Sequence, residues 1–327
     1  MSKDVVIIRG KVVADVAAAL SGEKEIYIFH DENVADVAAD VAAALPAGIV
    51  RAIIGIKASE ELKTMETAVG LTEKLLEGNA SRGALVLAIG GGITTDLAGF
   101  AASMYKRGIR YANVPTTLLA QVDAAIGGKT GVNLHGFKNM LGAFHMPEFT
   151  FLTPSVLSSL PRKELLCGLA EMLKTFLIGD ASAYSSCTEG GWTEDLVFRA
   201  ARIKADIVTR DPLEHGERAV LNLGHSFGHA IEHCSGGEIA HGEAVAMGII
   251  LAARLSEGLG VATTGLATRL EADFGRVGLE TKCPYGIQEL VPALRKDKKD
   301  GKFVLPVEPG KVVVMEVKED DLYKYTK

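Results

Sequence analysis

The sequence predicts an α/β protein in which a parallel sheet covered by helices is followed by a mainly helical second half. Over residues 1–150, short unbroken apolar segments alternate with segments of helical spacing. Unbroken apolar strands are typical of parallel sheets that are buried on both faces. After Phe151 strand-like segments become rare. We therefore expect two domains, residues 1–150 and residues 151–327.

The first domain contains five segments with the composition of buried strands and three with the apolar spacing of helices. The expected strands are 5–8, 26–29, 49–54, 85–89 and 111–114. The expected helices are 34–45, 59–77 and 94–104. In the second domain only 302–306 and 311–315 have strand character, so the remainder is expected to be helical.

Composition narrows the class of protein. A net charge of −6 argues against binding to nucleic acid through bulk electrostatics. The N-terminal residues lack the apolar core of a signal peptide, and no segment is apolar over a membrane-spanning length. The four cysteines are widely spaced without a CxxC pair, which is typical of reduced thiols. We expect a cytoplasmic protein with neither a nucleic-acid nor a membrane partner.

A glycine-rich turn, Gly90 to Gly92, connects the expected strand 85–89 to the expected helix 94–104. Glycines let the backbone approach a pyrophosphate, and the free amides at a helix N-terminus attract its charge. The spacing is not GxGxxG, so this turn alone is equally compatible with an ordinary strand-to-helix connection.

Residues 114–139 concentrate hydroxyl, carboxylate, amine and amide groups. Each has an ordinary structural interpretation, since threonines can cap a helix and an Asp–Lys pair can lie on the surface. Their density favours a site instead. Six basic residues can supply the positive pocket that a phosphorylated acid needs. They are Arg107, Lys129, Lys138, Lys204, Arg218 and Lys298.

His225 and His229 lie one helical turn apart and therefore on one face of a helix. With Glu171 and His241 they can supply the nitrogen and oxygen ligands of an open zinc site. A single helical histidine is more often a surface or core residue than a ligand. The combination of two histidines with further polar motifs favours a metal site.

A competing motif overlaps this one. His229, Glu232 and His233 match the H-x-x-E-H pattern, in which both histidines bind zinc and the glutamate acts as a base for peptide hydrolysis. That interpretation explains neither the glycine turn nor the basic residues.

Five motifs together resemble the 3-dehydroquinate synthases, which are sugar phosphate cyclases of the dehydroquinate synthase-like superfamily. They are residues 90–100, 114–123, 127–133, 168–174 and 221–232, within a similarity that extends roughly from Asp31 to Leu305. The resemblance implies a Rossmann-like NAD-binding domain followed by a mainly α-helical domain that binds metal and substrate.

The resemblance also implies two cofactors, NAD and one divalent metal, which is zinc with cobalt as the alternative. The implied metal ligands are Glu171, His225 and His241, while His229 faces the substrate in a proton-transfer network. The implied NAD-binding positions are Asp31, Asn33, Glu60, Lys63, Gly91, Gly92, Ile93, Asp96, Thr116, Thr117, Lys138 and Ser159.

The remaining matched positions concern the substrate. The resemblance places Asp123, Lys174 and Lys204 with His229 among the catalytic residues. It assigns Arg107, Lys129, Asn139, Arg218, Asn222 and Lys298 to substrate binding, with Arg107 reaching the neighbouring site of a homodimer. Of these, Arg218 with Lys204 suits a carboxylate, and Lys129, Asn139, Asn222 and Lys298 suit a phosphate.

The implied reaction converts 3-deoxy-D-arabino-heptulosonate 7-phosphate into 3-dehydroquinate and phosphate, a step toward aromatic amino acids in the shikimate pathway. It proceeds by transient oxidation, loss of phosphate, re-reduction and intramolecular aldol closure. Three alternatives stay open from the sequence: another sugar phosphate cyclase, an NAD- and metal-dependent polyol dehydrogenase, and a degenerate protein that binds without turnover.

Overall fold

The computed structural model describes residues 5–135, 137–297 and 301–326. Contacts between Cα atoms group the chain into two compact units. The first comprises Met1–Pro161 and Lys204–Leu213, and the second comprises Arg162–Ile203 and Glu214–Lys327. Helix α7 (Glu194–Arg210) contributes residues to both. The functional division at residue 150 stays a prediction.

The first unit is built on a six-stranded sheet in which every neighbouring pair is parallel. Its order is β1 (Ile7–Arg9), β8 (Thr150–Leu152), β5 (Arg110–Pro115), β4 (Leu85–Gly90), β2 (Ile26–Asp31) and β3 (Val50–Ile56). The predicted parallel sheet is confirmed, and its five predicted strands lie within a few residues of the observed ones. Strand β8 was not predicted, because it contains just two consecutive apolar residues, Phe151 and Leu152, whereas the equally short β1 overlaps the apolar segment 5–8.

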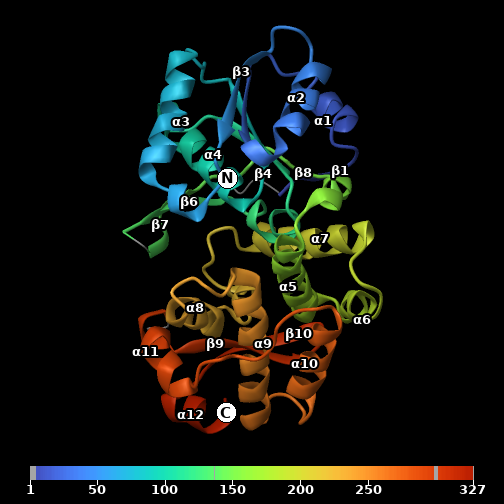
Figure 1. Cartoon of the computed structure of the whole chain (residues 1–327), viewed down its shortest axis with the longest axis vertical. Helices are drawn as coiled ribbons and strands as arrows, with labels where there is room; N and C mark the ends of the chain where they lie inside the picture. The colour runs from blue at the N-terminus through green and yellow to red at the C-terminus, as the bar shows by residue number, and fades with distance from the viewer. Residues whose placement is uncertain (1–4, 136, 298–300, 327) are drawn as a thin grey trace. The chain divides into compact units, whose positions relative to one another are not determined.

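Helices cover both faces of this sheet (Figure 1). Side chains of α1 (Ala14–Ala19) and α2 (Ala35–Ala44) pack with one set of strand residues, and those of α3 (Met65–Glu77) and α4 (Gly92–Met104) pack with the alternate set. Successive residues of a strand point to opposite faces. The nearly continuous apolar sequence of the central strands β2 and β4 follows from burial on both sides.

Chain order places a topological switch point between β2 and β4. From β2 the chain continues to β3 on one side, whereas from β4 it continues to β5 on the other. In open α/β sheets, ligands bind beyond the carboxyl ends of the strands at such a point. The segments after β2 and β4 are Asp31–Val34 and Gly91–Ile93, and both contain predicted NAD-binding positions.

A two-stranded hairpin, β6 (Lys129–Leu134) and β7 (Phe137–Phe144), follows β5 in the first unit and was not predicted. Its residues carry glycines and charged side chains that interrupt a strand pattern. Its antiparallel pairing is supplemented by Thr130, whose Oγ1 donates to the carbonyl of Ala143 at 3.0 Å.

The second unit is mainly helical, as expected. Its helices are α5 (Arg162–Gly179), α6 (Ala181–Gly190), α8 (His225–Cys234), α9 (His241–Gly258), α10 (Leu266–Arg276), α11 (Ile287–Asp297) and α12 (Glu319–Tyr325). The predicted late strands form an antiparallel hairpin, β9 (Lys302–Glu308) and β10 (Lys311–Glu316). No helix among the described residues is long and apolar enough to cross a membrane.

Two glycines let helices α5, α8 and α9 approach backbone to backbone. A Cβ on Gly242, at the start of α9, would lie 2.3 Å from the Cα of Cys167 on α5. A Cβ on Gly248 would lie 2.1 Å from the carbonyl oxygen of Gly224, the residue before α8. Any side chain here would force the helices apart, so both glycines fix the separation of the three helices.

We expect Gly248→Ala to destabilise the second unit by about 1–3 kcal/mol or more, because the added methyl group overlaps backbone that cannot move without separating α8 from α9. Equilibrium urea unfolding would measure this change. Gly275→Ala is the matched control, since a methyl group added at this position of α10 would have no neighbour within 4 Å among the described residues, and alanine is the better helix former. Equal stabilities of the two variants would contradict the packing argument.

Candidate functional site

Three side chains of the second unit converge from three helices. Glu171 lies on α5, His225 is the first residue of α8 and His241 is the first residue of α9. One potential ligand atom from each lies within 4.8 Å of the other two. The Nε2 atoms of His225 and His241 lie 3.5 and 3.3 Å from Glu171 Oε1. The arrangement has the three protein ligands of an open zinc site.

Both histidines are oriented through their other nitrogen. Nδ1 of His225 lies 3.2 Å from the carbonyl oxygen of Leu223, and Nδ1 of His241 lies 3.3 Å from Glu232 Oε2. A carbonyl or carboxylate oxygen only accepts, so each Nδ1 carries the donated hydrogen. In a neutral ring, the lone pair is then on the Nε2 that faces Glu171. Metal-binding histidines are held in this way.

Glu171 is a completely buried carboxylate, and neither of its oxygens accepts a hydrogen bond within the described part of the chain. Its compensating charge is Lys174, one turn along α5, which is also buried and forms an ion pair with it. Burial raises the pKa of the Glu171 carboxyl, but Lys174 and the two histidines outweigh this effect and hold the pKa well below its usual range. An ionised, buried carboxylate that faces the Nε2 atoms of two histidines fits a bound divalent cation.

The two histidines differ in their electrostatic environment. Burial, followed by the charge of Lys174, lowers the pKa of His225 to about 3, so its ring is neutral. Burial also lowers the pKa of His241, but the carboxylates of Glu171 and Glu232 outweigh it and raise the pKa to about 10. A metal ion binds a neutral histidine ring, so metal binding at this cluster would displace the proton on Nε2 of His241.

His229 lies beside this cluster. Its ring centroid is 5.4 Å from that of His225 and 6.4 Å from that of His241. The ligand cluster found among the described residues consists of Glu171, His225 and His241, and His233 is exposed. This geometry does not support the H-x-x-E-H interpretation, which requires His229 and His233 at one metal.

Glu232 is the residue whose place sequence reasoning missed, because it entered only as the base of the competing motif. A signal was present: His225, His229 and Glu232 follow the i, i+4, i+7 spacing of one helix face. That spacing places Glu232 on the side of α8 that carries the histidines.

Two further predicted residues of the second unit have defined surroundings. Arg218 is buried on the 3₁₀ helix η6 (Glu217–Asn222). Asn222, at the end of the same segment, donates from Nδ2 to Glu214 Oε1 at 2.9 Å. The predicted phosphate-binding residue Lys298 lies outside the described residues.

In the first unit, the predicted NAD-binding residues follow the carboxyl ends of the parallel strands. Asp31 ends β2, Glu60 and Lys63 follow β3, the segment Gly91–Ile93 follows β4, Thr116 and Thr117 follow β5, and Ser159 follows β8. Carboxyl ends of parallel strands share one edge of the sheet, which explains why residues distant in sequence gather there. Helix α4 begins at Gly92, so its free amides face this edge.

Hydrogen bonds fix several residues at this edge of the sheet. Asp31 Oδ1 accepts from the backbone and side-chain nitrogens of Asn33, both at 2.9 Å. The hydroxyl of Thr117 accepts from the amide of Ala120 at 3.2 Å, so this threonine has the capping contact that was its ordinary structural interpretation. Ser159 and Lys138 are exposed.

Lys63 joins residues that the sequence assigned to two different ligands. Its buried Nζ donates to Asp96 Oδ2 at 2.5 Å and to Asn139 Oδ1 at 2.6 Å. Burial raises the pKa of the Asp96 carboxyl above its usual value, although Lys63 acts against this. The amide of Asn139 donates to Asn133 Oδ1, and Asn133 Nδ2 donates to Glu60 Oε1. The network attaches the hairpin β6–β7 to the sheet edge.

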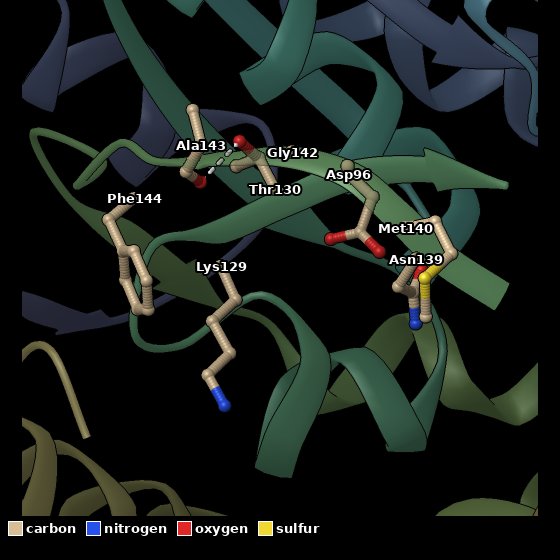
Figure 2. Close-up of a pocket in the computed structure, with 9 residues that line it drawn as sticks. Asp96, Lys129, Thr130, Asn139, Met140, Gly142, Ala143 and Phe144 are labelled. Atoms are coloured by element: carbon tan, nitrogen blue, oxygen red, sulfur yellow. Dashed lines mark hydrogen bonds between the residues drawn. The ribbon is translucent and has the colours of Figure 1, made fainter. Parts of the chain in front are cut away.

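A cavity of about 360 Å³ lies beside the hairpin (Figure 2). Asp96, Asn139 and Met140 line one part of it, while the Lys129 side chain extends away from them. A predicted NAD-binding carboxylate therefore shares one cavity with two predicted substrate-binding side chains.

The structure also pairs two of the predicted catalytic residues. Lys204 Nζ donates to the backbone carbonyl and to Oδ1 of Asp123, both at 2.7 Å. Arg107 lies at the exposed end of η3 (Tyr105–Arg107), and its φ of 67° follows a φ of 48° at Lys106. Two successive non-glycine residues in the left-handed region are rare and mark a constrained turn.

Comparison with known proteins identifies the family to which the chain is related. The family model for the 3-dehydroquinate synthase N-terminal domain matches residues 53–167, and the model for the C-terminal domain matches residues 168–300. A 3-dehydroquinate synthase of Pyrococcus abyssi is 44% identical over 277 residues, which are 82% of this chain and 82% of that protein. One of Symbiobacterium thermophilum is 42% identical over 302 residues, covering 87% and 84%.

Solved structures agree at the level of the whole fold. A 2-epi-5-epi-valiolone synthase from Streptomyces hygroscopicus, solved with NAD⁺ and Zn²⁺ bound, matches with a TM-score of 0.90 and 28% identity, covering 99% of this chain and 96% of that one. A 2-deoxy-scyllo-inosose synthase shares the fold with a TM-score of 0.83 at 23% identity, covering 99% and 98%. Both family models and the similarity to the named relatives extend over most of the sequence, and on these grounds the chain belongs to the 3-dehydroquinate synthase family.

Proposed function

We propose that the protein converts 3-deoxy-D-arabino-heptulosonate 7-phosphate into 3-dehydroquinate and inorganic phosphate. The observation that carries this proposal is the agreement between the family match over residues 53–300 and the cluster of Glu171, His225 and His241. Several relatives with this name are 39–44% identical to the chain, whereas the valiolone synthase is 28% identical.

The proposed metal ligands are Glu171, His225 and His241. Bound there, a divalent ion, zinc or alternatively cobalt, would act as a Lewis acid on the substrate hydroxyl that is oxidised. Lys174 keeps Glu171 ionised, and Leu223 and Glu232 direct the Nε2 atoms of the two histidines inward.

The proposed NAD site lies on the first unit at the carboxyl edge of the sheet. Glycines at positions 91 and 92 bring the backbone and the start of α4 close to a pyrophosphate, and Asp31 and Glu60 offer carboxylates to ribose hydroxyls. The cofactor would remove a hydride from the substrate and return it within the same turnover.

The remaining polar residues are proposed to bind and orient the substrate. Arg218 and Lys204 suit its carboxylate, because a guanidinium binds a carboxylate through two hydrogen bonds. Lys129, Asn139, Asn222 and Lys298 suit its phosphate. A phosphate only accepts hydrogen bonds, so Asn139 and Asn222 would donate to it from Nδ2. Asn139 can do so while its Oδ1 still accepts from Lys63, whereas Asn222 Nδ2 now donates to Glu214. His229 and Lys174, next to the ligand cluster, are proposed to move and balance protons.

The overall reaction predicts a distinctive product balance. We expect phosphate release from the seven-carbon keto acid phosphate without net accumulation of NADH, because the hydride returns to the substrate. A coupled phosphate assay across candidate sugar phosphates, with absorbance at the NADH band recorded in parallel, would measure both. Steady NADH formation would indicate a polyol dehydrogenase, and turnover only of a substrate without a carboxylate would indicate another cyclase. A lack of any turnover with every substrate would favour a binding protein.

The two neighbouring histidines of α8 should differ in metal retention. We expect His225→Ala to lose bound zinc and activity, because one of three protein ligands is gone. His229→Ala should retain zinc and lose turnover by roughly 10²–10⁴-fold, the usual range for a proton-transfer group. Metal analysis of both purified variants separates the roles, and equal zinc loss in both would contradict the assignment.

The homodimer and the role of Arg107 are proposed together. If Arg107 acts in the partner's site, mixing Arg107→Ala with His225→Ala should restore about a quarter of wild-type activity, because half of randomly mixed dimers carry one intact site of two. Each variant alone should be nearly inactive. Mixed samples that remain as inactive as the separate variants would contradict action across the dimer.

A further inference from the structure

We propose that Glu232 is a positioning residue that holds His241 in the orientation and tautomer in which it binds the metal. This inference rests on the proposed metal site and extends it to a residue of α8 outside the ligand set.

The geometry places the His241 ring between two carboxylates. Its Nδ1 lies 3.3 Å from Glu232 Oε2, and its Nε2 lies 3.3 Å from Glu171 Oε1. The Glu232 side chain is only 10% exposed, so its carboxylate is largely removed from water. Because an ionised carboxylate only accepts, Nδ1 donates, and in the neutral ring the lone pair of Nε2 is directed toward Glu171.

His241 needs this support more than His225 does. The ring of His225 is 14% exposed and oriented by the backbone carbonyl of Leu223, which substitution cannot remove. The side chain of His241 is 32% exposed, more than twice the exposure of His225. Within the described residues, Glu232 is the hydrogen-bond partner of its Nδ1. Loss of that carboxylate would leave the Nε2 contact with Glu171 to orient the ring without a partner on Nδ1.

The alternative role for Glu232 is that of a base beside a metal held by His229 and His233. That arrangement would require His233 to turn inward, but His233 is exposed and Glu232 contacts His241 instead. His233 is therefore the matched control, since it neighbours Glu232 on the same helix and lies outside the ligand cluster.

The test uses purified full-length Glu232→Ala, Glu232→Gln and His233→Ala. Zinc affinity would be measured by competition with a chromophoric chelator, and the site geometry by the visible absorption of the Co²⁺-substituted proteins. We expect Glu232→Ala to weaken zinc binding by about 10–100-fold, the usual effect of removing such a partner, and to change the cobalt spectrum. Glu232→Gln, whose carbonyl oxygen can accept the same hydrogen, should weaken binding only a few-fold, and His233→Ala should match the wild type.

The outcomes are distinguishable. If the wild type binds no zinc at this site, the proposed metal site fails and the role of Glu232 fails with it. If the wild type binds zinc and both Glu232 variants keep its affinity and cobalt spectrum, only the positioning role is overturned. A loss in His233→Ala as large as in Glu232→Ala would instead support the H-x-x-E-H arrangement. Thermal unfolding of the metal-free proteins detects misfolding. If Glu232→Ala does not fold, Glu232→Met, which keeps a side chain of similar size but no carboxylate to accept the hydrogen bond, replaces it, and wild-type zinc affinity in that variant overturns the proposal.

Discussion

The buried carboxylate of Glu171 is the constraint on which the architecture of the second unit depends. A charge removed from water is strongly destabilising unless other charges and ligands surround it. Lys174 lies one turn away, and two histidines face the carboxylate from α8 and α9. These groups can meet only if three helices approach closely. Glycines at 242 and 248 occupy the positions where a Cβ would overlap neighbouring backbone.

The first unit satisfies a different requirement, which is to gather polar groups without burying them in the core. Buried apolar residues dominate its central strands, and the parallel strands end together at one edge of the sheet. Polar residues that follow each strand therefore become neighbours. Lys63 links Asp96 on α4 with Asn139 on β7. These hydrogen bonds attach the hairpin β6–β7, which is not part of the six-stranded sheet, to the sheet edge.

Sequence patterns predicted the structure correctly where one pattern of side chains dominates a segment. The unbroken apolar strands predicted the parallel sheet, and the histidine spacing located the cluster on α8. Strand β8 contains just two consecutive apolar residues, and β6–β7 carries Lys129, Asn133 and Asn139 in place of an apolar pattern. Spacing alone also could not separate His225 from His229, because both lie on one helix face and only the positions of α5 and α9 distinguish them. The family resemblance supplied that distinction.

The same limit explains Glu232. Its position on α8 was readable, but its partner His241 belongs to another helix, and no local pattern reports a contact between two helices. Sequence motifs thus identify the chemical groups of a site more readily than the residues that orient them.

The most direct test of the account is a crystal structure of zinc-loaded protein with anomalous data collected on both sides of the zinc edge. We expect one strong peak bounded by a Glu171 oxygen and the Nε2 atoms of His225 and His241, with Glu232 on Nδ1 of His241. A peak held by His229 and His233, or no peak near Glu171, would contradict it.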